Sequence, residues 1–144
     1  MNSTNISLIK FKECLSQWTK LNEKGEQCLS QQVLGQPSKE LEKIIAQFKQ
    51  VLDTMIEEYT KTVDNLNLQE NLKSNDDNHV SEELILMKSC VDMYDQEFMV
   101  KESIKYIIST EGFTTQQQLA GTIALWKAES YLDDEVQQKI KEMK

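Results

Sequence analysis

The sequence predicts an all-α fold: an antiparallel hairpin of two long helices, a third long helix and short C-terminal helices, as in a helical bundle or a coiled-coil-like domain. Only four glycines and one proline occur in 144 residues, and so few turn residues favour a small number of long elements. Apolar residues also recur at intervals of three and four, which is the period of an amphipathic helix. The length fits one domain over residues 1–144.

The expected helices span about residues 4–34, 38–70, 81–110, 114–130 and 133–143, with a polar linker over 72–80. Gly35 and Pro37 end the first helix, because glycine suits a C-terminal cap and proline cannot continue the hydrogen-bond ladder. Each later helix has an expected N-capping residue, since Ser, Thr and Asp accept from free amides in the first turn. These residues are Ser38, Ser81, Thr114 with Gln117 as a capping box, and Asp133 or Asp134.

The helix over 38–70 has the most regular apolar pattern, with the 4-3-4-3-4 spacing of a coiled coil. This stripe consists of Leu41, Ile45, Phe48, Leu52, Met55 and Tyr59, then Thr62 or Val63, then Leu66. Ile44, Val51 and Ile56 widen it, so the helix is expected to contact more than one neighbour and to form the spine of a compact bundle. The stripe of the third helix includes Leu84, Met87, Val91, Tyr94, Phe98, Lys101, Ile104, Ile107 and Ile108.

The charge balance argues against two classes of partner. The sequence has twenty-four acidic residues and sixteen basic ones, which are all lysines, so the net charge is -8. Direct binding of nucleic acid is not expected, because such proteins concentrate positive charge and favour arginine. Membrane binding is not expected either, since anionic lipid repels acidic chains and no apolar run approaches the ~20 residues of a span. The N-terminus lacks the pattern of a signal peptide, so an intracellular, non-secreted protein is expected.

No constellation of residues points to catalysis, to a cofactor or to a metal. The one histidine, His79, falls in the predicted linker, where it has no fixed neighbour to tune its pKa or to share a metal. The three cysteines are widely spaced and are expected to be reduced and structural. Acidic runs such as Glu57-Glu58, Glu82-Glu83 and Asp133-Asp134-Glu135 are expected to be solvated faces or helix starts. The sequence therefore predicts a protein that is not an enzyme.

The large aromatic residues lie mostly on apolar stripes, so packing in the core is the first expectation for each of them. A smaller share could anchor a partner protein. The sequence does not sort Trp18, Phe48, Tyr59, Tyr94, Phe98 and Trp126 between these two roles.

Two stretches together resemble a known family. The first helix contains W-x-x-L-N-x-x-G over Trp18–Gly25, and the third contains MYDQEFMVK over Met93–Lys101, with Trp126 following 25 residues later. This order and spacing resemble the cyclin-dependent kinase 2-interacting protein family.

The resemblance implies a non-enzymatic nuclear adaptor or scaffold, with the cytoplasm as a second location. Its implied partners, bound through helical faces, are AAA+ ATPases related to valosin-containing protein, a second small helical subunit and cell-cycle kinases. The implied processes are ribosome maturation and DNA replication with its checkpoint. The implied structural and interface residues are Trp18, Leu21, Asn22 and Gly25 at the end of the hairpin, and Tyr94, Phe98 and Trp126 in a C-terminal cluster. The alternative is a structural coiled-coil subunit of a cytoskeletal or kinetochore-type complex.

Overall fold

The computed structural model describes the backbone of residues 3–70 and 77–143 and the side chains of residues 7–66 and 82–143. Within these ranges the chain forms five helices and no strand, which confirms the all-α class. The helices are α1 (Ser3–Ser30), α2 (Lys39–Glu70), α3 (Asp77–Thr110), α4 (Gln116–Ala128) and α5 (Asp134–Glu142). None of these helices is both long enough and apolar enough to cross a membrane.

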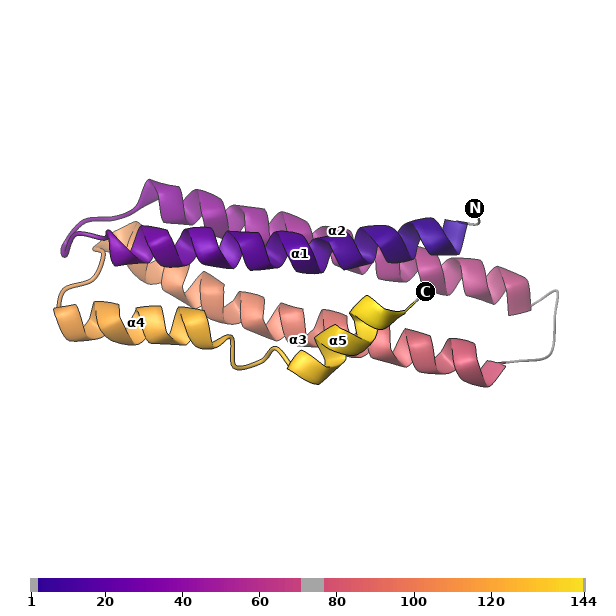
Figure 1. The fold of residues 1–144 in the computed structure, drawn as a ribbon. Coiled ribbons are helices and arrows are strands. Elements are labelled where there is room, and N and C mark those ends of the chain that lie inside the picture. The colour runs from indigo at the N-terminus through magenta and orange to yellow at the C-terminus, as the bar shows by residue number, and fades with distance from the viewer. Residues whose placement is uncertain (1–2, 71–76, 144) are drawn as a thin grey trace.

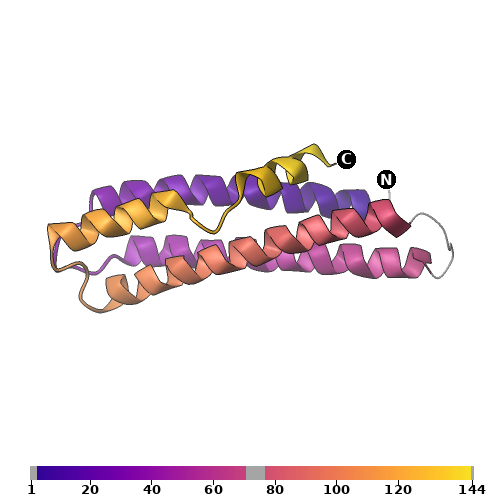
Figure 2. The same ribbon diagram turned by 90° about the horizontal axis from the view of Figure 1, so that it is seen from below.

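The helices form an elongated bundle in which α4 and α5 together take the place of a fourth helix (Figures 1 and 2). Helix α2 packs against α1 and α3, while α4 and α5 both contact α1 and α3. Helices α1 and α3 therefore lie diagonally across the bundle, and neighbours run antiparallel, as in an up-and-down four-helix bundle. The expectation that α2 contacts more than one neighbour is confirmed: it lies against the helix of Trp18 and the helix of Tyr94 and Phe98.

The core follows the predicted stripes, since burying one apolar face of each helix is what makes a bundle stable. The first five positions of the α2 stripe, from Leu41 to Met55, are almost fully buried. Of the three residues expected to widen that stripe, Ile44 and Val51 are buried, but Ile56 is 38% exposed. The widened face therefore covers only the N-terminal part of α2, next to α1.

Helix α1 ends at Ser30, one turn before the predicted limit near residue 34. Gly35 does adopt the left-handed conformation, with φ of 77°, but it lies in the following loop. Its amide donates to the carbonyl of Phe113, with an N···O distance of 2.7 Å. The connection must dock on the turn after α3, so the helix stops early and leaves residues 31–38 free to cross the end of the bundle.

Helix α3 begins at Asp77, so the predicted start at residue 81 and the capping role of Ser81 are wrong. Residues 77–80, including His79, have a helical backbone and do not belong to a linker, and residues 71–76 lie outside the described part. The apolar stripe marks where a helix is packed, and a polar first turn leaves no such mark.

The starts of the other helices combine confirmed predictions with one shift of register. The Ser38 hydroxyl accepts from the amide of Leu41 at 3.1 Å, and Asp133 caps α5, as expected. The capping box of α4 lies one residue later than predicted, with Thr115 as the N-cap and Gln118 as its partner. The Gln118 side-chain oxygen accepts from the amide of Thr114, the residue before the N-cap.

Candidate functional site

The structure brings most of the seven candidate residues together in the middle of the bundle. Trp18, Tyr94 and Trp126 have no exposed surface, Leu21 and Phe98 are 8% exposed, Gly25 is buried and Asn22 is half-buried. Leu21 and Phe98 lie at the edge of this group: Leu21 lines a groove between α1 and α2, and the ring of Phe98 lies 6.0 Å from the Lys49 ammonium.

Four aromatic rings from four helices meet edge to face at the centre. The ring centroids are 4.5 Å apart for Trp18 and Phe48, 4.8 Å for Trp18 and Tyr94, and 5.6 Å for Phe48 and Trp126. Such T-shaped pairs stabilise by about 0.5–1.5 kcal/mol each beyond the area that they bury. Phe48 therefore links the two tryptophans of the sequence motifs, and Tyr94 joins them through its contact with Trp18.

A lysine lies among these rings. The Lys101 side chain has no exposed surface, and its ammonium donates to the side-chain oxygen of Asn22 at 2.8 Å and to the carbonyl of Trp126 at 3.4 Å. The same nitrogen lies 4.0 Å from the centre of the Trp126 ring, where a cation–π interaction replaces part of the lost hydration. A polar residue of α1 and a tryptophan of α4 thus hold a cation from α3.

One buried carboxylate, Glu97, and one that is 18% exposed, Glu129, complete the site. Glu97 and Glu129 each place an oxygen near the ammonium of Lys101, at 3.8 Å and 3.7 Å. The Trp18 indole donates to Glu129 at 2.6 Å, and the Tyr131 amide donates to Glu97 at 3.2 Å. The oxygen of Glu97 that lies 3.8 Å from the ammonium, Oε2, is buried and accepts no hydrogen bond within the described chain, whereas the Tyr131 amide donates to the other oxygen, Oε1. These three charged residues, with Trp18, Asn22 and Trp126, are called the Lys101 cluster below.

Burial shifts the pKa of each charged group in the Lys101 cluster. Loss of hydration raises the pKa of Glu97 and of Glu129 and lowers the pKa of Lys101, while the opposite charges partly counter each shift. With one cation for two carboxylates, the cluster holds more negative than positive charge.

Glu129 occupies an unusual backbone position. It follows α4 in the left-handed conformation, with φ of 42°, where helices most often have glycine and where other residues are strained by about 1–2 kcal/mol. This turn ends α4 and directs the carboxylate toward Trp18 and Lys101. The break between α4 and α5 is therefore where the cluster receives its second acid.

The W-x-x-L-N-x-x-G pattern has a physical explanation here. Trp18, Asn22 and Gly25 are spaced four and three residues apart, so they share one face of α1. The Trp126 indole donates to the carbonyl of Asn22 at 2.8 Å, and a Cβ added to Gly25 would lie 2.0 Å from the Trp126 ring. Only glycine at this position lets α4 bring its tryptophan against α1.

This arrangement organises packing and does not present a reactive group to solvent, since Lys101 and Glu97 are at most 1% exposed. Burial raises the pKa of Cys14 to about 11 and that of Cys90 to about 12, which keeps both thiols protonated. Burial also holds the pKa of Tyr94 well above its usual range. Among the described residues, no group of His, Cys, Asp and Glu side chains is placed to hold a metal.

Sequence reasoning missed the charged members of the cluster. Lys101 occupies a position of the apolar stripe of α3. A charged residue at such a position is the sequence feature that could have indicated a buried ion. Glu97 precedes Lys101 by one turn, on the same face. Glu129 gave no signal, because its role depends on the break after α4. The expectation that Glu57-Glu58 is a solvated face is wrong for Glu58, which is 3% exposed.

The pH dependence of stability tests the state of Glu97. Because its pKa is raised in the folded protein, the folded state binds more protons between the unfolded and the folded pKa, and stability falls as pH rises through that interval. Glu97→Gln removes this titrating group. The melting temperature of the variant, relative to that of the parent, should therefore increase as pH rises from the pKa of an unfolded glutamate toward neutrality. Melting curves across that range check this. The prediction fails if the difference between the two proteins does not change with pH.

No protein-family model matches this chain, and neither curated proteins nor solved structures show a significant match to it. The fold and the site define a class nevertheless, an all-α bundle whose centre holds four contacting aromatic rings and, beside two of them, a buried, paired lysine.

Proposed function

We propose that this chain is a non-enzymatic nuclear adaptor or scaffold subunit that binds other proteins through its helical faces. The proposed assembly contains AAA+ ATPases related to valosin-containing protein and a second small helical subunit, and contacts with cell-cycle kinases belong to the same proposal. Its proposed roles are in ribosome maturation and in DNA replication with its checkpoint. The resemblance to the cyclin-dependent kinase 2-interacting protein family supports this choice of partners and processes.

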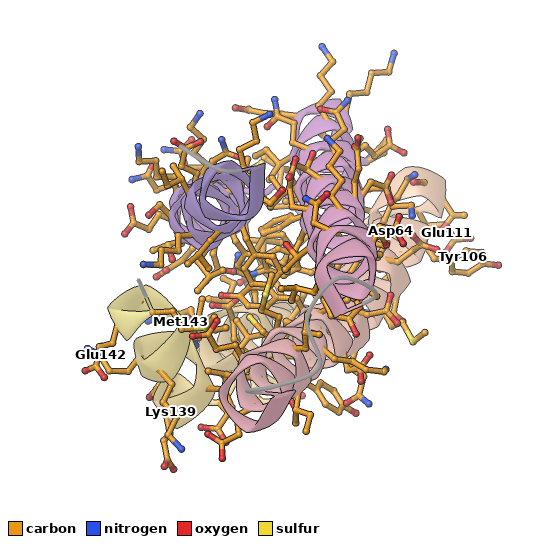
Figure 3. The ribbon with its side chains drawn as sticks, turned by 90° about the vertical axis from the view of Figure 1, so that its right-hand side faces the viewer. Asp64, Tyr106, Glu111, Lys139, Glu142 and Met143 are labelled. Carbon is orange, nitrogen blue, oxygen red and sulfur yellow. The ribbon has the colours of Figure 1, made fainter. Side chains whose placement is uncertain are left out.

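The observation that carries the adaptor role is an apolar stripe on the outer face of α3. Ile85, Met99 and Tyr106 are 66%, 61% and 75% exposed, although single exposed apolar residues are usually scattered. They occupy a heptad register, with exposed Asp92 at the intervening position, so they align on one side of the helix. Tyr106 points away from the bundle (Figure 3). This set is called the α3 stripe below.

The charges beside the α3 stripe indicate what kind of surface would cover it. Asp95 and Glu102 lie three residues after Asp92 and Met99, on one flank of the stripe, and neither forms an ion pair within the described chain. An apolar ridge with acidic neighbours complements an amphipathic helix with a lysine- or arginine-bearing flank. The α3 stripe is therefore proposed to bind such a helix of a partner subunit.

The packing of α2 favours an adaptor over the coiled-coil alternative. The heptad positions from Leu41 to Met55 are at most 1% exposed, so this apolar stripe is already covered by the other helices of the chain. A structural coiled-coil subunit would leave such a stripe for its partner. The Lys101 cluster joins the inner face of α3 to α1 and α4, and the outer face of α3 stays exposed.

Affinity purification with mass spectrometry tests this function. The tagged chain is expected to recover an AAA+ ATPase and a small helical protein, and Met99→Lys with Tyr106→Lys should reduce their recovery at least about tenfold. These positions are exposed, so the double variant should keep its stability within about 0.5 kcal/mol.

The matched control is Val33→Lys with Leu125→Lys, which places two lysines at exposed apolar positions away from α3. This control should retain both partners. Recovery of neither an AAA+ ATPase nor a small helical protein by the parent chain would contradict the proposal. If both double variants lost the partners equally, the α3 stripe would not be the binding surface.

A further inference from the structure

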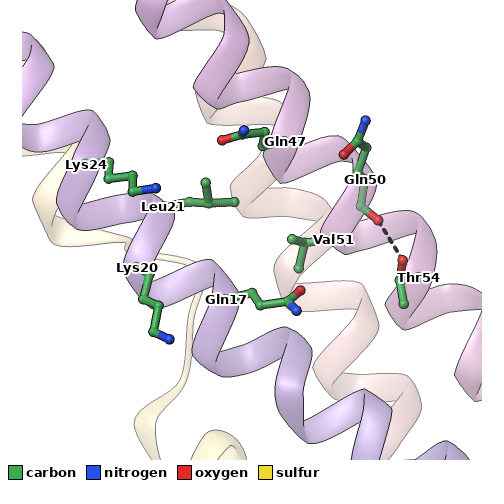
Figure 4. Close-up of a pocket in the computed structure, with 8 residues that line it drawn as sticks. All are labelled: Gln17, Lys20, Leu21, Lys24, Gln47, Gln50, Val51 and Thr54. Carbon is green, nitrogen blue, oxygen red and sulfur yellow. Dashed lines mark hydrogen bonds between the residues drawn. The ribbon is translucent and has the colours of Figure 1, made fainter.

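A groove runs along the outer seam between α1 and α2, in the layer of the bundle that does not contain the α3 stripe. Its first section has a volume of about 380 Å³ and lies between the middle of α1 and the middle of α2 (Figure 4). A second section of about 450 Å³ continues toward the end of α1. Lys24 and Gln47 line both sections, so the two are continuous.

The floor of the groove is apolar and its rim is polar. Leu21 and Val51 point into the space between the two helices in the first section (Figure 4), and Ile44 lines the second. Glutamines make up much of the rim, and their side-chain amides form no hydrogen bond within the described chain; they are Gln17, Gln27, Gln31, Gln47 and Gln50. Free amides above an apolar floor are suited to orient a bound side chain or peptide.

The sign of the charge on the groove is opposite to that of the whole chain. Three lysines line it, Lys20, Lys24 and Lys43, against the single carboxylate of Glu40. None of the three lysines forms an ion pair within the described chain, so no described carboxylate lies within ion-pair distance of their ammonium groups. In a chain with a net charge of -8, these lysines form a local site for negative charge.

We propose that the groove between α1 and α2 binds an acidic amphipathic helix of a partner protein. Apolar side chains of that helix cover Leu21, Val51 and Ile44, and its carboxylates pair with the rim lysines. From Gln17 to Gln31 the groove follows about 21 Å of helix, which matches about 14 residues of a partner helix. The inference rests on the proposed adaptor function and adds a second docking face, which selects partners of the opposite charge from those of the α3 stripe.

Two other anionic partners suit the groove less well. Nucleic acid presents a charged backbone that the net charge of -8 repels at longer range. A lipid surface is flat and would not fill a groove between two helices. The apolar floor favours a protein helix over nucleic acid and lipid, because only a helix offers apolar side chains at a helical spacing.

The experiment uses the full chain and two labelled helical peptides of about 16 residues. One peptide has leucines along one face and glutamates on its flanks, and the other has lysines in place of the glutamates. Fluorescence anisotropy should show saturable binding of the glutamate peptide and at least about tenfold weaker binding of the lysine peptide. Lys20→Glu with Lys24→Glu should weaken binding of the glutamate peptide at least about tenfold.

The control variant Lys10→Glu with Lys141→Glu makes the same change of charge at exposed lysines outside the groove, and it should bind like the parent. Met99→Lys with Tyr106→Lys should also bind like the parent, which separates this test from that of the adaptor function. Failure of both peptides to bind, or equal loss in groove and control variants, would overturn the inference. Binding of phosphatidylserine vesicles or single-stranded DNA, abolished in the groove variant while the glutamate peptide is ignored, would also overturn it.

Discussion

Replacing Lys101 with methionine is expected to lower the free energy of unfolding by about 3–5 kcal/mol, the usual cost of removing one partner from a buried ion pair. Methionine keeps much of the length of the side chain, so the effect reports the charge more than the volume. The change leaves the buried Glu97 and the partly buried Glu129 without their cation, and it leaves the side-chain oxygen of Asn22 without its donor. Urea unfolding followed by far-UV circular dichroism measures the loss.

Lys88→Met is the matched control on the same helix. Lys88 pairs with Asp92 at 3.1 Å, but both side chains are more than half exposed, so the pair contributes at most about 0.5 kcal/mol. A triple variant, Lys101→Met with Glu97→Gln and Glu129→Gln, removes the uncompensated charges and should recover part of the stability. If Lys101→Met unfolds at the same urea concentration as Lys88→Met, then Lys101 is not held in the core as described.

Gly25→Ala is expected to lower the free energy of unfolding by about 2 kcal/mol, because overpacking a well-packed core costs about 1–3 kcal/mol or occasionally more. The new methyl group would lie 2.0 Å from the Trp126 ring. That ring cannot easily move, since its indole donates to Asn22 and its face contacts the ammonium of Lys101. Displacing Trp126 also shifts its emission, so intrinsic fluorescence measures the same event independently of unfolding.

The control is Gly121→Ala, in the middle of α4, where nothing lies within 4 Å of the added Cβ. Alanine is favoured over glycine in helices by about 1 kcal/mol, so this variant should be slightly more stable than the parent. Two variants with the same chemical change should therefore move in opposite directions. A gain of stability by both would mean that α4 does not pack tightly on α1.

The helical class and much of the core were predictable because both depend on local periodicity. The stripe from Leu41 to Met55 is buried as expected, since a hydrophobic face of that length must be covered whatever the topology. The N-caps Ser38 and Asp133 also follow from the chemistry of a few adjacent residues.

Positions that depend on contacts between distant segments could not be predicted. The loop after α1 contacts the turn after α3 through the hydrogen bond between Gly35 and Phe113, and the start of α3 lies in a polar turn that leaves no pattern. The grouping of Trp18 with Glu129, and of Lys101 with Asn22, joins residues far apart in the sequence.

The sequence by itself therefore determined the helices, their apolar faces and the spacing of Trp18, Asn22 and Gly25 on one side of α1. Only the tertiary structure decided that α4 and α5 act as one broken fourth helix, and that the break turns Glu129 toward a lysine in the core. The physical reason is the range of the forces involved. Helix formation and amphipathicity are set by neighbours within a few residues, whereas a buried charge is stable only where several distant groups supply its partners together.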